Sequence, residues 1–208
     1  MSDSKSDPIS NLTLSQVPGN TPLDQDDVAL LIPSLSTQGE LNQFEEANIT
    51  EANAWALNPR TLKIQDPFTE HYVRELHKRM FNQTWKWAGI YRAKELSIGV
   101  PYHEIRNQIP ALLGNARYWI DNKTFDPDEI AIRVHHRMAW IHPFRNGNGR
   151  HARLLADVIA VKNGHEQFTW GSITLAAAGP GRAEYIRCLK AADANNDDIQ
   201  GLLRFARS

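Results

Sequence analysis

The feature that most constrains this fold is a glycine-containing segment, residues 142–153, flanked by two stretches with helical periodicity. Before it, Asp126-Pro127 supplies an N-cap and a proline at the first helical position, and the helix predicted from there ends at His142-Pro143. After it, apolar residues recur at helical spacing until Asn163-Gly164, where the second helix is expected to end. The segment is therefore predicted to be a loop held between two buried helices.

The loop has the composition of an anion-binding site. Gly147 and Gly149 permit positive φ and remove side chains, so that consecutive backbone N–H groups can converge on one small volume. The second helix is expected to begin at about Asn148, and its unpaired N–H groups and positive dipole end face that volume. Arg150 and Arg153 share a helix face, where their guanidinium groups would bind further phosphates. Simple solvation of the two arginines is the alternative.

His142 stands at the entry of the loop, where a neutral imidazole would accept a proton from a hydroxyl that attacks the bound phosphate. A structural role for this histidine is the alternative. Phe144, the apolar residue inside the loop, is expected to point inward and hold the shape of the nucleotide-binding segment. The residues by themselves thus indicate phosphoryl or nucleotidyl transfer.

The loop resembles the Fic (Fido) motif, His-x-Phe-x-(Asp/Glu)-Gly-Asn-Gly-Arg-x-x-Arg, and matches six of its seven core positions together with the trailing arginine. Two flanking runs are also similar to the family: residues 85–92 to the segment that leads into its flap, and residues 182–189 to its C-terminal helix. The likeness covers residues 68 to 205. It implies a mostly α fold, a Fic-like helical bundle with a short β-hairpin flap.

The resemblance implies a nucleotidyltransferase that moves AMP, or a related phosphate-linked group, from ATP to a Ser, Thr or Tyr hydroxyl of a protein target. His142 would be the general base. Residues 147–149 would surround the α- and β-phosphates, Arg150 would bind the β-phosphate and Arg153 the γ-phosphate. Tyr185 would line the nucleotide pocket, although helical packing explains it almost as well.

At one motif position the sequence departs from the family, because Asn146 replaces the acid that holds Mg²⁺ against the phosphates. An amide oxygen can bind a hard cation but contributes no charge, so Mg²⁺ would be held weakly. Slow transfer, or transfer of another group, is the first interpretation. The alternatives are reversal of the reaction, as in a de-AMPylase, and a catalytically weak or inactive module that binds nucleotide or phosphate.

Residues 90–101 mix β-favouring residues with Gly and Pro and are predicted to form a short hairpin. By resemblance this hairpin would be the flap that aligns a target segment by strand addition. Its docking residues would be Leu96, Ser97, Ile98, Gly99 and Val100.

Many members of the family carry an inhibitory helix whose glutamate pairs with the second motif arginine. The nearest candidate is Glu40, which has a serine, Ser36, at the family's spacing. Its pairing with Arg153 is the hypothesis, and an ordinary solvated acid at a helix start is the alternative.

The chain is expected to have three parts. Residues 1–35 are rich in Ser, Asp, Asn and Pro, so they are predicted to be a flexible N-terminal arm. Residues 36–67 show helical periodicity and are expected to pack on the core or regulate it. Residues 68–208 would form the Fic-like domain, with further helices expected over about 104–122, from about Thr174, and over 181–194.

Composition restricts the partners. Basic residues number 23 and acidic residues 24, so the formal net charge of −1 creates no field that would attract nucleic acid or an anionic membrane. No apolar run approaches the roughly 18 residues of a membrane span. Cys188 is the only cysteine and excludes an intramolecular disulfide. We therefore expect a cytoplasmic protein that binds neither nucleic acid nor a membrane. The family resemblance implies a nucleotide and a protein target as partners; a homodimer or an antitoxin partner stays open.

Overall fold

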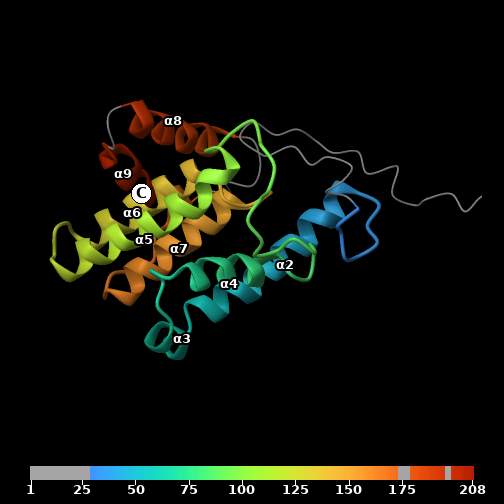
Figure 1. The fold of residues 1–208 in the computed structure, drawn as a ribbon, viewed down its shortest axis with the longest axis horizontal. Coiled ribbons are helices and arrows are strands. Elements are labelled where there is room, and N and C mark those ends of the chain that lie inside the picture. Colours follow the sequence, from blue (N-terminus) through green and yellow to red (C-terminus); the bar gives the residue numbers. More distant parts are fainter. Residues whose placement is uncertain (1–28, 173–178, 195–197) are drawn as a thin grey trace, which may run out of the picture.

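The computed structural model describes residues 29–172, 179–194 and 198–208, and most of these residues are helical (Figure 1). Two helices form its centre: α6 (Pro127–Ile141) and α7 (Asn148–Lys162) pack against each other and are joined by the glycine-containing loop. Helix α5 (Ile105–Asp121), preceded by the short 3-10 helix η1 (Tyr102–Glu104), packs against α6. The expectation of a mostly α fold is confirmed.

Three helices near the N-terminus pack together and onto this centre. Helix α2 (Gln38–Ala56) lies along α4 (Glu70–Phe81), and the short α3 (Pro59–Ile64) connects them (Figure 1). Helix α4 also contacts α7 and α5. The segment expected over residues 36–67 therefore packs on α4 and, with α3, on α7.

The C-terminal part contains α8 (Pro180–Ala194), α9 (Gln200–Arg207) and the short 3-10 helix η2 (Trp170–Ser172). Helix α9 packs against α8, η2 and α6. The helix expected to begin at about Thr174 lies outside the described residues. No described helix is both long enough and apolar enough to cross a membrane.

The ends of α6 agree with the local sequence signals. The side chain of Asp126 accepts the N–H of Asp128 at 2.9 Å, and Pro127 occupies the first helical position. The apolar stripe of this helix is fully buried; it consists of Ile130, Val134, Met138 and Ile141. Burying a large apolar side chain contributes about 1.5–3 kcal/mol relative to exposing it. The core therefore anchors the helix that carries the loop.

The predicted hairpin over residues 90–101 is wrong. Within the described ranges the structure has no strands and only two isolated antiparallel bridges, Leu31 with Trp85 and Tyr91 with Phe144. The chain after α4 thus pairs with the loop between α6 and α7, and not with a second strand of its own segment.

The physical reason lies in how residues 92–100 return to the end of α6. The Val100 N–H donates to Ile141 O at 3.3 Å, and Gly99 adopts a φ of +99° that a side chain would oppose. The side chain of Arg92 takes the carbonyls that a strand partner would otherwise pair. The segment is therefore a folded loop on α6.

The expected arm, residues 1–35, lies mostly outside the described residues. Its described end runs antiparallel to the segment after α4, because Lys86 N–H donates to Leu30 O at 3.0 Å and Ile32 N–H to Thr84 O at 2.9 Å. This pairing leads the chain directly into α2.

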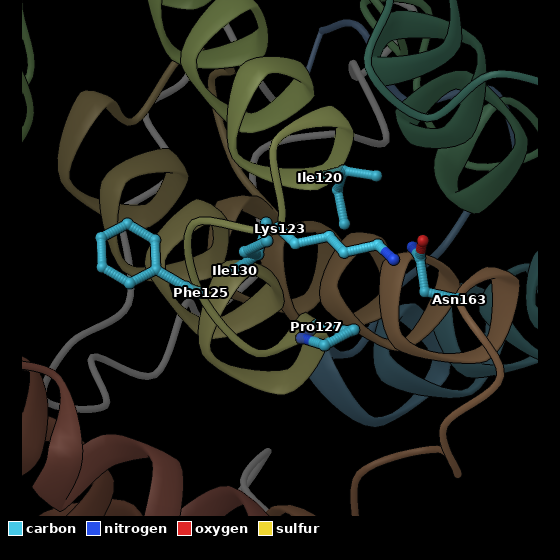
Figure 2. A pocket seen from close by; sticks show the side chains of 6 residues that line it. All are labelled: Ile120, Lys123, Phe125, Pro127, Ile130 and Asn163. Carbon is cyan, nitrogen blue, oxygen red and sulfur yellow. The ribbon is translucent and has the colours of Figure 1, made fainter.

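A hollow of about 280 Å³ lies at the end of the α6–α7 pair away from the loop (Figure 2). Since α6 has 15 residues, about 22 Å of helix separates this hollow from the loop. The hollow is therefore remote from the residues that the sequence singled out. The side chains that line it are Ile120, Lys123, Phe125, Pro127, Ile130 and Asn163.

Candidate active site

His142 ends α6 in a left-handed backbone conformation, with φ 54° and ψ 59°. For a residue other than glycine this conformation costs about 1–2 kcal/mol. It turns the chain out of the helix, while the His142 N–H still donates to Met138 O at 3.1 Å. The imidazole is consequently placed at the entry of the loop.

Hydrogen bonding and burial define the protonation state of His142. Its Nδ1 lies 3.2 Å from Ala139 O, and because a carbonyl can only accept, Nδ1 carries the proton and Nε2 does not. Burial lowers the pKa of His142 to about 4; the hydrogen bond to Ala139 opposes this shift and the charge of Arg92 adds to it. The ring is therefore neutral near pH 7 and Nε2 can accept a proton.

Two residues brace the loop from inside. The Asn148 Oδ1 accepts the Phe144 N–H, and the Asn148 Nδ2 donates to Phe144 O, both at 2.8 Å. Phe144 is fully buried, as expected, and Asn148 is 2 % exposed. The Asn148 side chain thus shapes the loop rather than projecting from it.

His77 packs directly against the loop, although the sequence did not single it out. Its ring is fully buried on α4 and stacks on Phe144, with the ring centroids 3.7 Å apart. The Gly89 N–H donates to Nδ1 at 3.0 Å, so Nε2 carries the proton and donates to Asn146 O, also at 3.0 Å. The sequence offered only a histidine on a helical stripe, which is no specific signal.

Gly147 is the N-cap of α7 and has a φ of +76°. A Cβ at this position would overlap the ring of Phe81. Both the backbone conformation and the space therefore require glycine here.

Asn146 stands where the family motif has its acid, and it is half-buried. Its Oδ1 accepts the Gly147 N–H at 2.6 Å. A divalent cation would meet a single neutral oxygen that already accepts a hydrogen bond, whereas Mg²⁺ is normally bound by carboxylates. This residue therefore fits a tightly held Mg²⁺ poorly.

The two motif arginines have different surroundings. Arg150 forms an ion pair with Glu45 of α2, with 2.5 Å between Nη1 and Oε2. Glu45 is 6 % exposed, and its other oxygen accepts the Trp85 Nε1–H at 2.7 Å. Sequence reasoning missed Glu45, because no local pattern distinguishes it from the neighbouring Glu46.

Arg153 instead lies near the loop and α8. Its guanidinium sits over the ring of Tyr185, 5.3 Å from the centroid. A Cβ at Gly149 would lie 3.7 Å from Arg153 Nη1 and 3.9 Å from the Tyr185 hydroxyl. The hydroxyl is 3.0 Å from Nε2 of buried His135, which fixes the tyrosine. Arg153 and Tyr185 therefore converge at the start of α7.

A third guanidinium, that of Arg182 in the first turn of α8, lies close to the motif arginines. Burial lowers its pKa, and the charges of Arg153 and Arg150 lower it further, while Tyr185 opposes them. Arg182 precedes Tyr185 by three residues and shares its helix face, a spacing that could have pointed to it.

The residues expected to dock the target lie on the loop that replaces the hairpin. Ser97, Ile98 and Gly99 are exposed, Leu96 is half-buried, and Val100 is buried. This loop touches His142, since a Cβ at Gly99 would lie only 2.6 Å from His142 Cβ.

Glu40 has a local role at the start of α2. It is exposed, and its Oε2 accepts the N–H groups of Ser36 and Thr37 at 2.8 and 3.0 Å in a capping box. These hydrogen bonds lower its pKa. The α2 carboxylate that reaches a motif arginine is that of Glu45.

Comparison with known proteins points to the same family as the motif in the loop. Residues 67–160 match the model of the Fic/DOC family, so this part of the chain is similar to a Fic/DOC domain. The resemblance expected from the loop is thereby confirmed.

Relatives with assigned names are similar over most of this chain. The protein adenylyltransferase Fic of Nematostella vectensis is 25% identical over 153 residues, which cover 72% of this chain and 34% of that protein. Protein adenylyltransferase fic-1 of Caenorhabditis elegans is 28% identical over 151 residues, covering 69% and 27%. The chain thus spans about a third or less of the length of these relatives.

A solved structure shares the fold. The BepC protein of Bartonella tribocorum, a VirB-translocated effector solved with bound AMPPNP, superposes with a TM-score of 0.62 at 17% identity. The superposition covers 92% of this chain and 93% of that one. The N-terminal Fic domain of another Bartonella effector protein also superposes with a TM-score of 0.62, at 16% identity, so the helical arrangement described above is the Fic fold.

Proposed function

We propose that this protein transfers AMP, or a related phosphate-linked group, from ATP to a hydroxyl of a protein target. The observation that carries the proposal is a neutral imidazole, that of His142, beside a glycine-bounded helix N-terminus where Arg153 and Tyr185 converge. The relatives named protein adenylyltransferase support it, as does the bound AMPPNP of the Bartonella protein.

The reaction would begin with proton transfer from the target hydroxyl to His142 Nε2. The hydroxyl oxygen would attack the α-phosphorus, the bond from that phosphorus to the bridging oxygen of the β-phosphate would break, and pyrophosphate would leave. The N–H groups at the start of α7 and the guanidinium of Arg153 would stabilise the negative charge of the phosphates. The proton on His142 would then pass to solvent or to pyrophosphate.

Mg²⁺ is not assigned a step in this scheme, because Asn146 provides one neutral and already bonded oxygen. The guanidinium groups and the helix N-terminus would supply the positive charge instead. The exposed residues Ser97–Gly99 would contact the target segment, as their position next to His142 favours.

A second candidate is a nucleotide-binding module without transfer. It is favoured by two observations: Asn146 stands in place of an acid, and Arg150 is already neutralised by Glu45. Such a module would bind ATP by the same helix N-terminus without using His142.

The test is incubation of the protein and of His142→Ala with radiolabelled ATP and cell lysate, followed by gel analysis. The proposal expects labelled protein bands with the wild type and none with His142→Ala. His103→Ala is the matched control, because His103 is exposed outside the site, and it should label like the wild type. Labelling that persists in His142→Ala would contradict the base. Calorimetric ATP binding without labelling in any variant would favour the module.

A further inference from the structure

Arg92 is a buried arginine whose donors go to backbone carbonyls of two chain segments. The residue is 3 % exposed. Its Nε donates to His142 O at 2.8 Å and its Nη1 to Lys94 O at 3.1 Å. Its Nη2 donates to Val100 O and, at 3.5 Å, to Ile141 O. The guanidinium therefore links the loop after Tyr91 to the end of α6.

The first of these segments is the C-terminus of α6, where the last carbonyls of a helix lack intrahelical partners. The guanidinium satisfies those of Ile141 and His142, and its positive charge is favourable at the negative end of the helix dipole. His142 is held here in a left-handed conformation that its own backbone disfavours. Arg92 thus fixes the backbone that carries the imidazole.

The second segment is residues 94–100, which contain the exposed positions next to His142. Val100 is held at both of its backbone groups, since its N–H donates to Ile141 O and its carbonyl accepts from Arg92. Arg92 also forms an ion pair with Glu95, with 3.7 Å between Nη1 and Oε2, but the Glu95 side chain is 60 % exposed. The backbone carbonyls are therefore the closer and less solvent-exposed partners of the guanidinium. The same guanidinium therefore holds this segment against α6.

We propose that Arg92 is a positioning residue for the transfer reaction, which locks residues 94–100 and the backbone of His142 into one unit. This inference rests on the proposed function, in which the unit aligns the target hydroxyl with the base. A lysine cannot replace the arginine, because one ammonium group does not reach carbonyls of two segments in the planar geometry of a guanidinium. The start of α7, where the nucleotide would bind, is not held by this side chain.

The first test measures amide hydrogen exchange by NMR in the full chain and compares Arg92→Lys with the wild type. The Val100 amide is expected to exchange about tenfold faster in the variant, the effect of weakening about one hydrogen bond. The His151 amide, which donates to Gly147 O within the α7 start, should exchange at the wild-type rate. Arg106→Lys, at an exposed position of α5, is the matched control. Unchanged exchange at Val100, or equal acceleration at both amides, would overturn the inference.

The second test separates nucleotide binding from transfer. For Arg92→Lys we expect label transfer to lysate proteins to fall about tenfold, while the calorimetric Kd for ATP changes by less than about twofold. Arg92→Ala should behave alike and regain transfer with millimolar guanidinium chloride, but not with sodium chloride. A parallel loss of ATP affinity, or no loss of transfer, would refute the role. If the wild type transfers no label, the proposed function fails, while the exchange measurement still decides whether Arg92 positions the two segments.

Discussion

Acidification should destabilise this protein, because burial lowers the pKa of four of its histidines. Burial lowers the pKa of His142 and His151 to about 4, and it lowers those of His77 and His135 well below the ordinary value. In the unfolded chain each would titrate near its ordinary value of about 6.5. Below that pH the unfolded state binds protons that the folded state does not, so stability falls as pH falls.

The magnitude follows from the two histidines with a pKa of about 4. Between pH 7.5 and pH 5, each lowers the free energy of unfolding by about 2 kcal/mol, at about 1.36 kcal/mol per pH unit. Asp157 opposes them, because burial raises its pKa to about 6. On acidification its folded form binds a proton at a higher pH than its unfolded form, which raises the free energy of unfolding by about 1.4 kcal/mol. The net loss is then at least about 2.5 kcal/mol, because His77 and His135 act in the same direction as the first two.

Urea unfolding at pH 7.5, 6 and 5 measures this loss, with the fluorescence of the six tryptophans as the signal. His142→Asn is the informative variant, because asparagine tolerates the left-handed conformation of this position and does not titrate. It should lose about 1.4 kcal/mol less than the wild type per pH unit below pH 6. Equal stability at pH 7.5 and pH 5, or a gain on acidification, would refute the reasoning.

Three further changes test the site itself. Asn146→Asp should tighten ATP binding about tenfold when Mg²⁺ is present and not when it is chelated, as calorimetry would measure, because an ionised carboxylate binds Mg²⁺ better than an amide. Glu45→Gln keeps an acceptor for the indole N–H of Trp85 but removes the negative charge paired with Arg150, so the affinity for ATP should rise about tenfold. The control Glu46→Gln, at an exposed position, should leave the affinity unchanged. Gly147→Ala should abolish ATP binding and lower the Tm by at least about 2 °C, because the new Cβ overlaps Phe81 in a strained conformation. Wild-type binding in that variant would contradict the described loop.

The sequence predicted those parts of the fold that depend on neighbouring residues. Asp126-Pro127 starts α6 as expected, and Asn163-Gly164 follows α7, because caps and helix stops act within one turn. The positive φ of Gly147 at the start of α7 was also predicted, since a glycine's freedom to adopt it is a local property. Local signals of this kind determine where the loop begins and ends.

The hairpin could not be judged in the same way. Residues 90–101 have the composition of strands, but β-propensity states only that a segment fits a pleated surface. The partner that the segment finds is the end of α6, through Arg92 and Val100. An arginine that caps a remote helix end leaves no periodic pattern in the sequence.

The same limit applies to the acid that meets the motif arginines. Glu40 matched the family spacing, but its nearest donors are the N–H groups of its own helix start. Glu45 lies further along α2, where the packing of this helix on α4 brings it to Arg150. Helix packing decides which of several acids is presented, and packing depends on residues distant in sequence.

The two motif arginines show why spacing alone does not assign a role. Arg150 and Arg153 share a helix face, and the sequence supports both equally as phosphate ligands. In the structure a phosphate that binds Arg150 must replace the carboxylate of Glu45. This replaces one anion by another of similar hydrogen-bonding strength. It also leaves the buried Glu45 carboxylate with the indole N–H of Trp85 as its remaining partner. Arg153 forms no ion pair with a carboxylate of the described residues; it lies over Tyr185 beside Gly149, and its charge acts on the pKa of Asp157 one turn further along α7. Net attraction for a nucleotide should therefore come mainly from Arg153, and its substitution should weaken ATP binding more than that of Arg150.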